Sequence, residues 1–338
     1  MSGGARKEAT RAGLCRVLSL GLIVLSGAAP AQNSASPPAT ISTPTAVTPS
    51  QIVAAAPAGD WIAIAPQDLL VMTLAPDAAG KARNVVIQLM PAPFSRSWVA
   101  NMRMLARAHW YDGTFVVRVQ DNYVAQWGDP DGEDPAKAKP LPSGLRPVPE
   151  SDYVQFGSLP IDARIGALLS PANDARRFSG FSGGFPFSGE RAAGAMKSWP
   201  MHCYGSVGVG RNVSPDTGTG AELYAVIGHA PRQLDRNIAV VGRVIEGIAH
   251  LSSMPRGTGD LGFYEKPVQR VAILSVRLAS DLPRAAQPRF EYLSTTSESF
   301  ARYAHARANR KDDFFITPAG SVDICNLPVP VRREGRGA

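Results

Sequence analysis

The sequence predicts a mainly β fold, a closed eight-stranded antiparallel barrel capped by two helices. Eight short runs rich in apolar and β-branched residues are bounded by turn residues, and most neighbouring runs are joined by short, hairpin-like connections. Strands and helices do not alternate along the chain, which argues against a doubly wound parallel sheet. The 32 glycines and 29 prolines among the 338 residues indicate many turns and few long helices.

Two stretches have helical rather than strand periodicity. Between residues 94 and 109, Trp98, Met102 and Leu105 recur at spacings of three and four, as on one face of an amphipathic helix. A shorter helix is expected over residues 244–252. The eight strands are expected at residues 68–75, 84–91, 113–120, 122–127, 202–209, 222–228, 238–242 and 270–278.

The N-terminal segment has the pattern of a secretory signal peptide. Four basic residues precede an apolar run over residues 17–29, and Ala29-Pro30-Ala31 fits a signal-peptidase site. The run is too short for a resident membrane span, so we expect residues 1–31 to be removed and the protein to be periplasmic or secreted. Removal takes away four basic residues and one acidic residue, which lowers the net charge from +7 to about +4. This charge does not cluster on one element, so no nucleic-acid partner is expected.

The rest of the chain divides into a tether, a barrel domain and an extension. Residues 32–59 contain no charged residue and are rich in Ser, Thr, Ala and Pro, which predicts a disordered tether. The barrel domain is expected over residues 60–280, interrupted at 133–200 by a long insertion with irregular structure or a functional loop. Residues 281–338 form a C-terminal extension with a short helix, whose start is indicated by a capping box at 295–298.

The cysteines and histidines favour neither a metal site nor a cofactor. Cys203 and Cys325 remain after signal removal; Cys203 is taken by default as a core residue, and one disulfide with Cys325, with which the even number is compatible in an oxidising compartment, is the alternative. The five histidines are scattered without the spacing of a zinc site.

Three short motifs are typical of other chemistry, but their surroundings argue against each. Residues 180–184 fit the G-x-S-x-G pattern of serine hydrolases with Ser182 as nucleophile, yet the preceding residues 176–178 do not look like a strand and a proline follows too soon for a helix. Three glycines between 205 and 210 lack the spacing of a dinucleotide loop. The acidic cluster at 129–134 has its glycine in the wrong place for a calcium loop.

Two blocks of sequence resemble the cyclophilin family of peptidyl-prolyl isomerases. Residues 111–119 (YDGTFVVRV) and 123–130 (YVAQWGDP) follow the family signature Y-D-G-T, R-V, Q-x-G-D-P, and residues 209–247 follow its second half in order. The resemblance covers roughly residues 65–280 apart from the insertion. It implies a cyclophilin-like barrel and a cofactor-free isomerase that acts as a monomer on proline-containing polypeptides.

The resemblance also implies a site. Arg118 matches the family's catalytic arginine, and Gln126 matches the glutamine that supports it. Glu222 stands where glutamine is usual, and we expect its carboxylate to form an ion pair with Arg118 that competes with substrate. The other positions that match substrate-binding residues of the family are Tyr123, Val124, Gly210, Arg211, Tyr224 and Leu234.

Two further departures are Ile238, where the family often has histidine, and Gln233, where some members have tryptophan. The resemblance implies an apolar slot for the substrate's proline ring, built from Tyr123, Val124, Tyr224 and Leu234. The hydroxyls of Tyr123 and Tyr224, where phenylalanine is usual, need water or a partner at the edge of this slot. The leading hypothesis is an isomerase that assists the folding of exported proteins. The alternative is a catalytically weak binding module or chaperone of the cell envelope with partner contacts in residues 133–200, and a third is a serine hydrolase.

Overall fold

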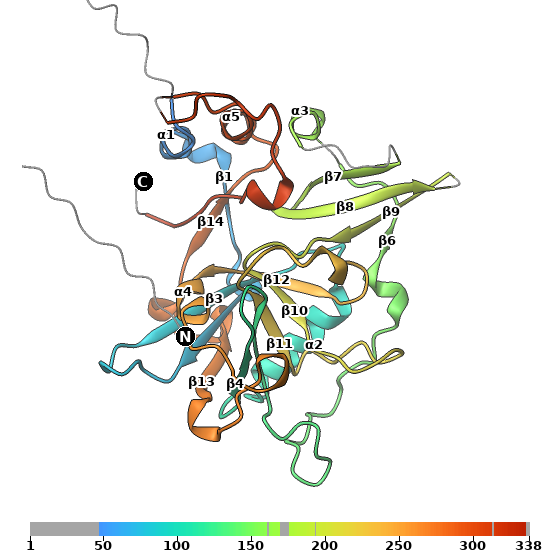
Figure 1. The fold of residues 1–338 in the computed structure, drawn as a ribbon, viewed down its shortest axis with the longest axis vertical. Helices are drawn as coiled ribbons and strands as arrows, with labels where there is room; N and C mark the ends of the chain where they lie inside the picture. The colour runs from blue at the N-terminus through green and yellow to red at the C-terminus, as the bar shows by residue number, and fades with distance from the viewer. Residues whose placement is uncertain (1–46, 161, 170–175, 193, 313, 336–338) are drawn as a thin grey trace, which may run out of the picture. The chain divides into compact units, whose positions relative to one another are not determined.

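The computed structural model describes residues 47–338 except 161, 170–175, 193, 313 and 336–338 (Figure 1). Eight strands close a barrel in the order β10-β11-β5-β4-β13-β2-β3-β12, and every neighbouring pair is antiparallel, which confirms the predicted fold class. The barrel strands are β2 (Leu69–Leu74), β3 (Arg83–Leu89), β4 (Phe115–Val119), β5 (Val124–Gly128), β10 (Ser206–Val209), β11 (Leu223–Val226), β12 (Val240–Glu246) and β13 (Val271–Leu278).

The main core fills the barrel and continues under helix α2 (Arg96–Arg107). Trp98, Met102 and Leu105 are fully buried there, so the predicted helical face is confirmed. Side chains alternate across the barrel wall. On β3, for example, Ile87 faces the main core, whereas Val86 lies in a separate cluster on the other side of the strand.

The second predicted helix begins later than expected. Val244 to Glu246 continue β12 and pair with β3, and helix α4 spans only Ile248–Ser252. The β-branched side chains of Val244 and Ile245 favour the strand. Gly247 then takes a φ of +84°, a conformation that suits glycine and separates the strand from the helix.

The insertion at 133–200 is not irregular throughout. Its second part forms a four-stranded antiparallel sheet in the order β6-β9-β8-β7. The residues before the G-x-S-x-G motif are therefore in a strand, contrary to the prediction, but no helix follows. Gly183 and Gly184, both with positive φ, make a two-residue hairpin turn between β7 and β8, so Ser182 lies in a hairpin and not on a nucleophile elbow. The strands are β6 (Gln155–Phe156), β7 (Arg177–Ser182), β8 (Phe185–Ala192) and β9 (Ala195–Pro200).

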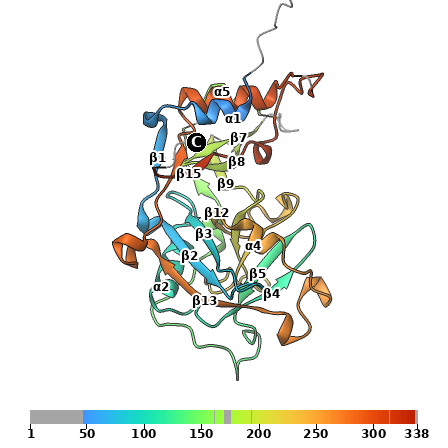
Figure 2. The same cartoon turned by 90° about the vertical axis from the view of Figure 1, so that its left-hand side faces the viewer.

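The two ends of the described chain fold together. Helix α1 (Pro49–Ala54), capped by Thr48, lies beside helix α5 (Glu298–Ala308), as Figure 2 shows. The end of the predicted 32–59 tether is therefore folded, because Ile52 finds an apolar partner surface on α5. The predicted signal peptide lies outside the described residues. The adjoining three-stranded sheet has the order β1-β14-β15, with β1 (Trp61–Ala63), β14 (Phe290–Leu293) and β15 (Val331–Arg333).

The C-terminal extension contains the predicted short helix, but its capping residue differs. Ser297, rather than Thr295, accepts a hydrogen bond from the backbone of Phe300 and so begins α5. Cys203 and Cys325 form a disulfide with a Cα–Cα distance of 5.1 Å, so the default expectation of an unpaired Cys203 is wrong and the disulfide alternative is correct. The disulfide joins the extension to the loop between β9 and β10. No helix in the described part of the chain is long and apolar enough to span a membrane.

Candidate active site

Three neighbouring strands bring the predicted catalytic residues together on the outside of the barrel. Arg118 on β4 is paired in register with Gln126 on β5, and Gln126 is paired with Tyr224 on β11. Directly opposed residues of antiparallel strands point to the same face of the sheet. The adjacent residues, such as Val119 and Ala125, face the barrel core, so the three site residues face outward.

The Arg118 guanidinium is fixed by three acceptors. Its Nε donates to the carbonyl of Leu261 at 2.7 Å, Nη1 donates to Gln126 Oε1 at 2.8 Å, and Nη2 donates to Gln120 Oε1. A guanidinium carries five N–H donors, so one on Nη1 and one on Nη2 remain without a partner among the described residues. Burial lowers the pKa of Arg118. The side chain is thus held rigidly with two donors available to a ligand.

Two aromatic rings flank this guanidinium. The ring centroid of Tyr123 lies 5.7 Å from the Arg118 Cζ, and that of Phe263 lies 5.3 Å from it. Phe263 was not predicted as a site residue. It follows β12 and α4 in a loop that has no strand pattern and no family motif, and an isolated bridge to Arg118 brings it to the site. Sequence alone contains no clear signal for this contact.

Glu222 acts on Arg118 through Gln126. The Gln126 Nε2 donates to Glu222 Oε1, which leaves Gln126 Oε1 facing Arg118. The expected ion pair between Glu222 and Arg118 is wrong, because the Gln126 amide stands between the two charges. Burial raises the pKa of Glu222, and the Gln126 hydrogen bond and the Arg118 charge partly offset this rise. The carboxylate therefore orients the amide that supports the arginine.

The predicted proline slot forms one apolar cluster beside Arg118. All four of its predicted residues belong to the cluster, and Val226 and Ile238 complete it. Ile238, noted above as a departure from the family, therefore adds an apolar wall. The buried members are Val124, Tyr224 and Val226, and the partly buried ones are Tyr123, Leu234 and Ile238.

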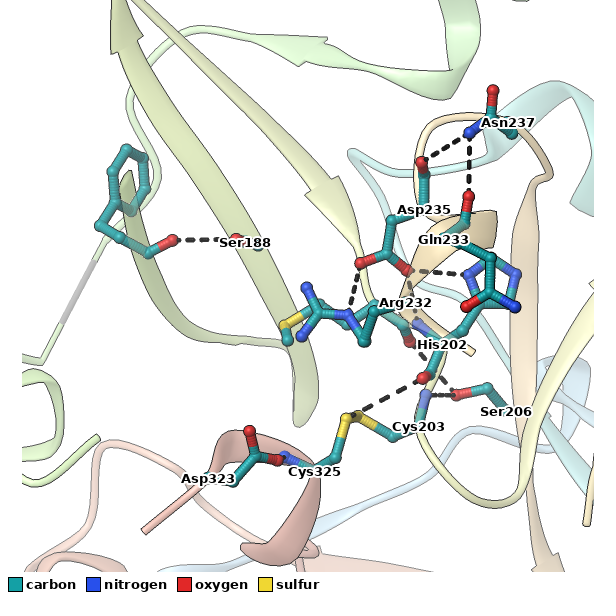
Figure 3. Close-up of polar contacts among 12 residues, drawn as sticks. Ser188, His202, Cys203, Ser206, Arg232, Gln233, Asp235, Asn237, Asp323 and Cys325 are labelled. Carbon is teal, nitrogen blue, oxygen red and sulfur yellow. Dashed lines mark hydrogen bonds and ion pairs between the residues drawn. A yellow bond between two sulfur atoms is a disulfide. The ribbon is translucent and has the colours of Figure 1, made fainter. Parts of the chain in front are cut away.

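The hydroxyl of Tyr224 has a protein partner behind the slot. His202 Nε2 lies 2.9 Å from this hydroxyl, and His202 Nδ1 lies 2.9 Å from Asp235 Oδ1. Asp235 also accepts from Arg232 Nε at 2.6 Å, so its carboxylate lies between the Arg232 guanidinium and the His202 ring (Figure 3). The Tyr224 hydroxyl therefore has the expected partner, and this partner is a buried histidine. A clash would occur if Gly208 carried a side chain, because the Tyr224 ring passes over it.

His202 was not predicted as a site residue, and no motif marks it. The ring is completely buried, and in the tautomer with Nδ1 donating to Asp235, Nε2 accepts a hydrogen bond from the Tyr224 hydroxyl. Asp235 directly follows Leu234, a member of the slot. His202 is consequently bonded to one slot residue and to the neighbour of another.

The remaining predicted residues lie on the other side of Glu222. Gly210 and Arg211 line a cavity of about 280 Å³ together with Glu222 and residues of the insertion. The Arg211 guanidinium donates to the carbonyls of Asn237 at 2.9 Å and Asn212 at 2.6 Å. These two hydrogen bonds to backbone carbonyls hold the loop that carries Arg211. The cavity adjoins Glu222 and so extends the candidate site beyond the slot.

Comparison with known proteins assigns the chain to a family. The sequence matches the family described as cyclophilin type peptidyl-prolyl cis-trans isomerase/CLD over residues 78–278, more than half of the chain. A search of curated proteins found no match. Among solved structures, a cyclophilin from Hirschia baltica, AquaCyp293, is similar in fold, with a TM-score of 0.61 and 22% identity over 81% of this chain and 93% of that one.

A second solved structure is more distant. A cyclophilin-type isomerase from Cryptosporidium parvum, crystallised in the presence of the dipeptide Ala-Pro, has a TM-score of 0.35 and 12% identity over 62% of this chain and 98% of its own. The family assignment depends on the sequence match, and the Hirschia structure supports the fold. The chain belongs to the cyclophilin-type peptidyl-prolyl cis-trans isomerases, cofactor-free enzymes that act on X-Pro peptide bonds.

Proposed function

We propose that Arg118 is the catalytic residue of this isomerase and that the cluster beside it binds the substrate proline. One observation carries the proposal: a guanidinium fixed by three acceptors presents, next to an apolar slot, two N–H donors that no described residue uses. Rotation about an X-Pro bond needs no covalent intermediate, only a lower barrier than the roughly 18–20 kcal/mol that amide resonance imposes.

The chemistry follows from what twisting does to the amide. Out of plane, the nitrogen lone pair no longer conjugates with the carbonyl and becomes a hydrogen-bond acceptor. A donor fixed at this nitrogen stabilises the twisted amide more than the planar one, which lowers the barrier by differential binding. The slot holds the proline ring while the rest of the peptide turns. Gln126 and Glu222 keep the Arg118 guanidinium in place, so little reorganisation is needed.

A protease-coupled proline-peptide assay tests this proposal. Arg118→Ala is expected to lower kcat/KM by roughly 10²–10³, the usual cost of removing one preorganised donor. The exposed Arg284 provides a matched control, since Arg284→Ala removes the same charge away from the site. If the wild-type chain shows no rate above background, the binding-module alternative replaces the isomerase. An active Arg118→Ala variant with unchanged kcat/KM refutes the assigned role of Arg118.

We further propose that the enzyme is exported and assists the folding of exported proteins. The basic residues, apolar run and small-residue site of the first 31 positions support export. The Cys203–Cys325 disulfide adds support, because structural disulfides persist in oxidising compartments. Mass spectrometry of the chain recovered from a producing bacterium tests this proposal.

A further inference from the structure

A second cavity, of about 270 Å³, lies where the barrel, the β7–β8 hairpin and the C-terminal extension meet. None of the proline-slot residues lines it. Many of its lining side chains are apolar, among them Met90, Phe185, Val329 and Val331, but polar and apolar atoms contribute about equally to its surface. Cys203, Ser206 and Cys325, which also line it, are seen in Figure 3. The cavity is at the small end of ligand pockets, which typically measure about 300–1,000 Å³.

One charged side chain, Arg243 of β12, is part of this wall. Its Nε donates to Gln88 Oε1 at 2.9 Å and its Nη1 donates to the carbonyl of Gly184 at 2.9 Å. Its Nη2 is buried and has no hydrogen-bond partner in the described structure. Aromatic rings of Phe185 and Tyr292 lie 4.8 and 6.0 Å from the Arg243 Cζ.

The guanidinium has no carboxylate partner among the described residues. Glu246, on the same strand, is paired with Arg333, and Glu291, next to Tyr292 on β14, is paired with Arg332. Burial lowers the pKa of Arg243 to about 10, so the group is still a cation at neutral pH. The two aromatic rings compensate this partly buried charge only in part, and an anion in contact with the guanidinium offsets more of the cost of desolvation.

We propose that this cavity binds a small monocarboxylate with an apolar body, its carboxylate paired with Arg243 and its hydrocarbon part against the apolar walls. A single cation favours a monoanion over a phosphate dianion. The fork of the guanidinium matches the two oxygens of a carboxylate. The apolar side chains of the lining match a hydrocarbon body better than a small hydrated ion. This site is separate from the isomerase site and does not depend on the role of Arg118.

Isothermal titration calorimetry of the full mature chain with sodium octanoate tests the proposal. We expect saturable one-site binding, and 1-octanol, which has the same chain without the charge, is expected to bind more weakly. A charged hydrogen bond is worth about 1.5–3 kcal/mol, so Arg243→Met is expected to weaken octanoate binding about tenfold to a hundredfold. The exposed Arg302 supplies the control, since Arg302→Met removes an equal charge elsewhere and is expected to leave affinity unchanged.

A second variant keeps the test decisive if Arg243→Met fails to fold. Val331→Trp fills the cavity while leaving Arg243 intact, and it is expected to abolish octanoate binding. Absence of saturable binding to the wild-type chain overturns the proposal. Wild-type affinity in either Arg243→Met or Val331→Trp also overturns it, because octanoate then binds somewhere else.

Discussion

His202 and Tyr224 are suited to a double-mutant cycle, because one buried hydrogen bond joins them behind the slot. Tyr224→Phe leaves His202 Nε2 unpaired, at a cost of about 1–3 kcal/mol in the free energy of unfolding. His202→Ala leaves the Tyr224 hydroxyl unpaired and also removes a charge-assisted bond to Asp235, which together cost about 3–5 kcal/mol. The shared bond is lost only once in the double variant, so the two effects should fall short of additivity by roughly 1–2 kcal/mol.

The same cycle separates a positioning role from a purely structural one. Tyr224 is part of the slot, and Asp235 holds the end of the short helix that carries Leu234. Loss of His202 therefore loosens two slot residues while leaving the three contacts of Arg118 intact. We expect KM for a proline peptide to rise about tenfold with a smaller change in kcat, since misplacement of a binding group by about 1 Å is known to be costly.

Urea unfolding and steady-state kinetics of the four proteins measure both quantities. His305→Ala, at an exposed position of α5, controls for the loss of a histidine. A coupling energy below about 0.5 kcal/mol refutes the energetic link, because independent sites add within that margin. An unchanged KM in His202→Ala refutes the positioning role even if stability falls.

Two further predictions concern Glu222 and export. Burial raises the pKa of the Glu222 carboxyl in the folded chain, so on a rise in pH the unfolded chain loses this proton first. The free energy of unfolding therefore falls as the pH rises from the ordinary pKa of a glutamate through the raised pKa of Glu222. Glu222→Gln removes this loss, so its stability advantage in urea unfolding should grow between pH 4 and 8; an advantage independent of pH contradicts the assignment. For export, the mature chain should begin at Gln32 and, without reductant, show no thiol that reacts with iodoacetamide. A chain retaining residues 1–31, or with two free thiols, contradicts that proposal.

The barrel could be predicted because its strands carry the information locally. Each has an apolar run, and the wall buries alternate side chains on β3 and its neighbours. The insertion sheet could not be predicted in the same way. Its strand β7 (RFSGFS) has glycine and serine where turns are expected, and its partners become clear only when β8 pairs with it along its whole length. The local composition of β7 predicts turns, but its pairing with β8 makes it a strand.

The site residues also differ in whether a local motif indicates them. Arg118, Gln126 and Glu222 are at fixed spacings within the family motifs, so the resemblance alone could propose them as site residues. Phe263 and His202 reach the site from segments without a motif, one through an isolated bridge and the other through a side-chain hydrogen bond. Such contacts depend on how loops pack, which no local pattern encodes. The expected ion pair of Glu222 was wrong for a related reason, since it depended on the position of the Gln126 amide.

The C-terminal extension is linked to the active site by a short covalent and hydrogen-bonded path. Cys325 is bonded to Cys203, the neighbour of His202, and the His202 ring holds the Tyr224 hydroxyl. The same loop provides walls for the Arg243 cavity, where Cys203 and Cys325 both contribute. The disulfide therefore connects the barrel with the C-terminal extension next to both His202, which bonds to the slot, and the Arg243 cavity.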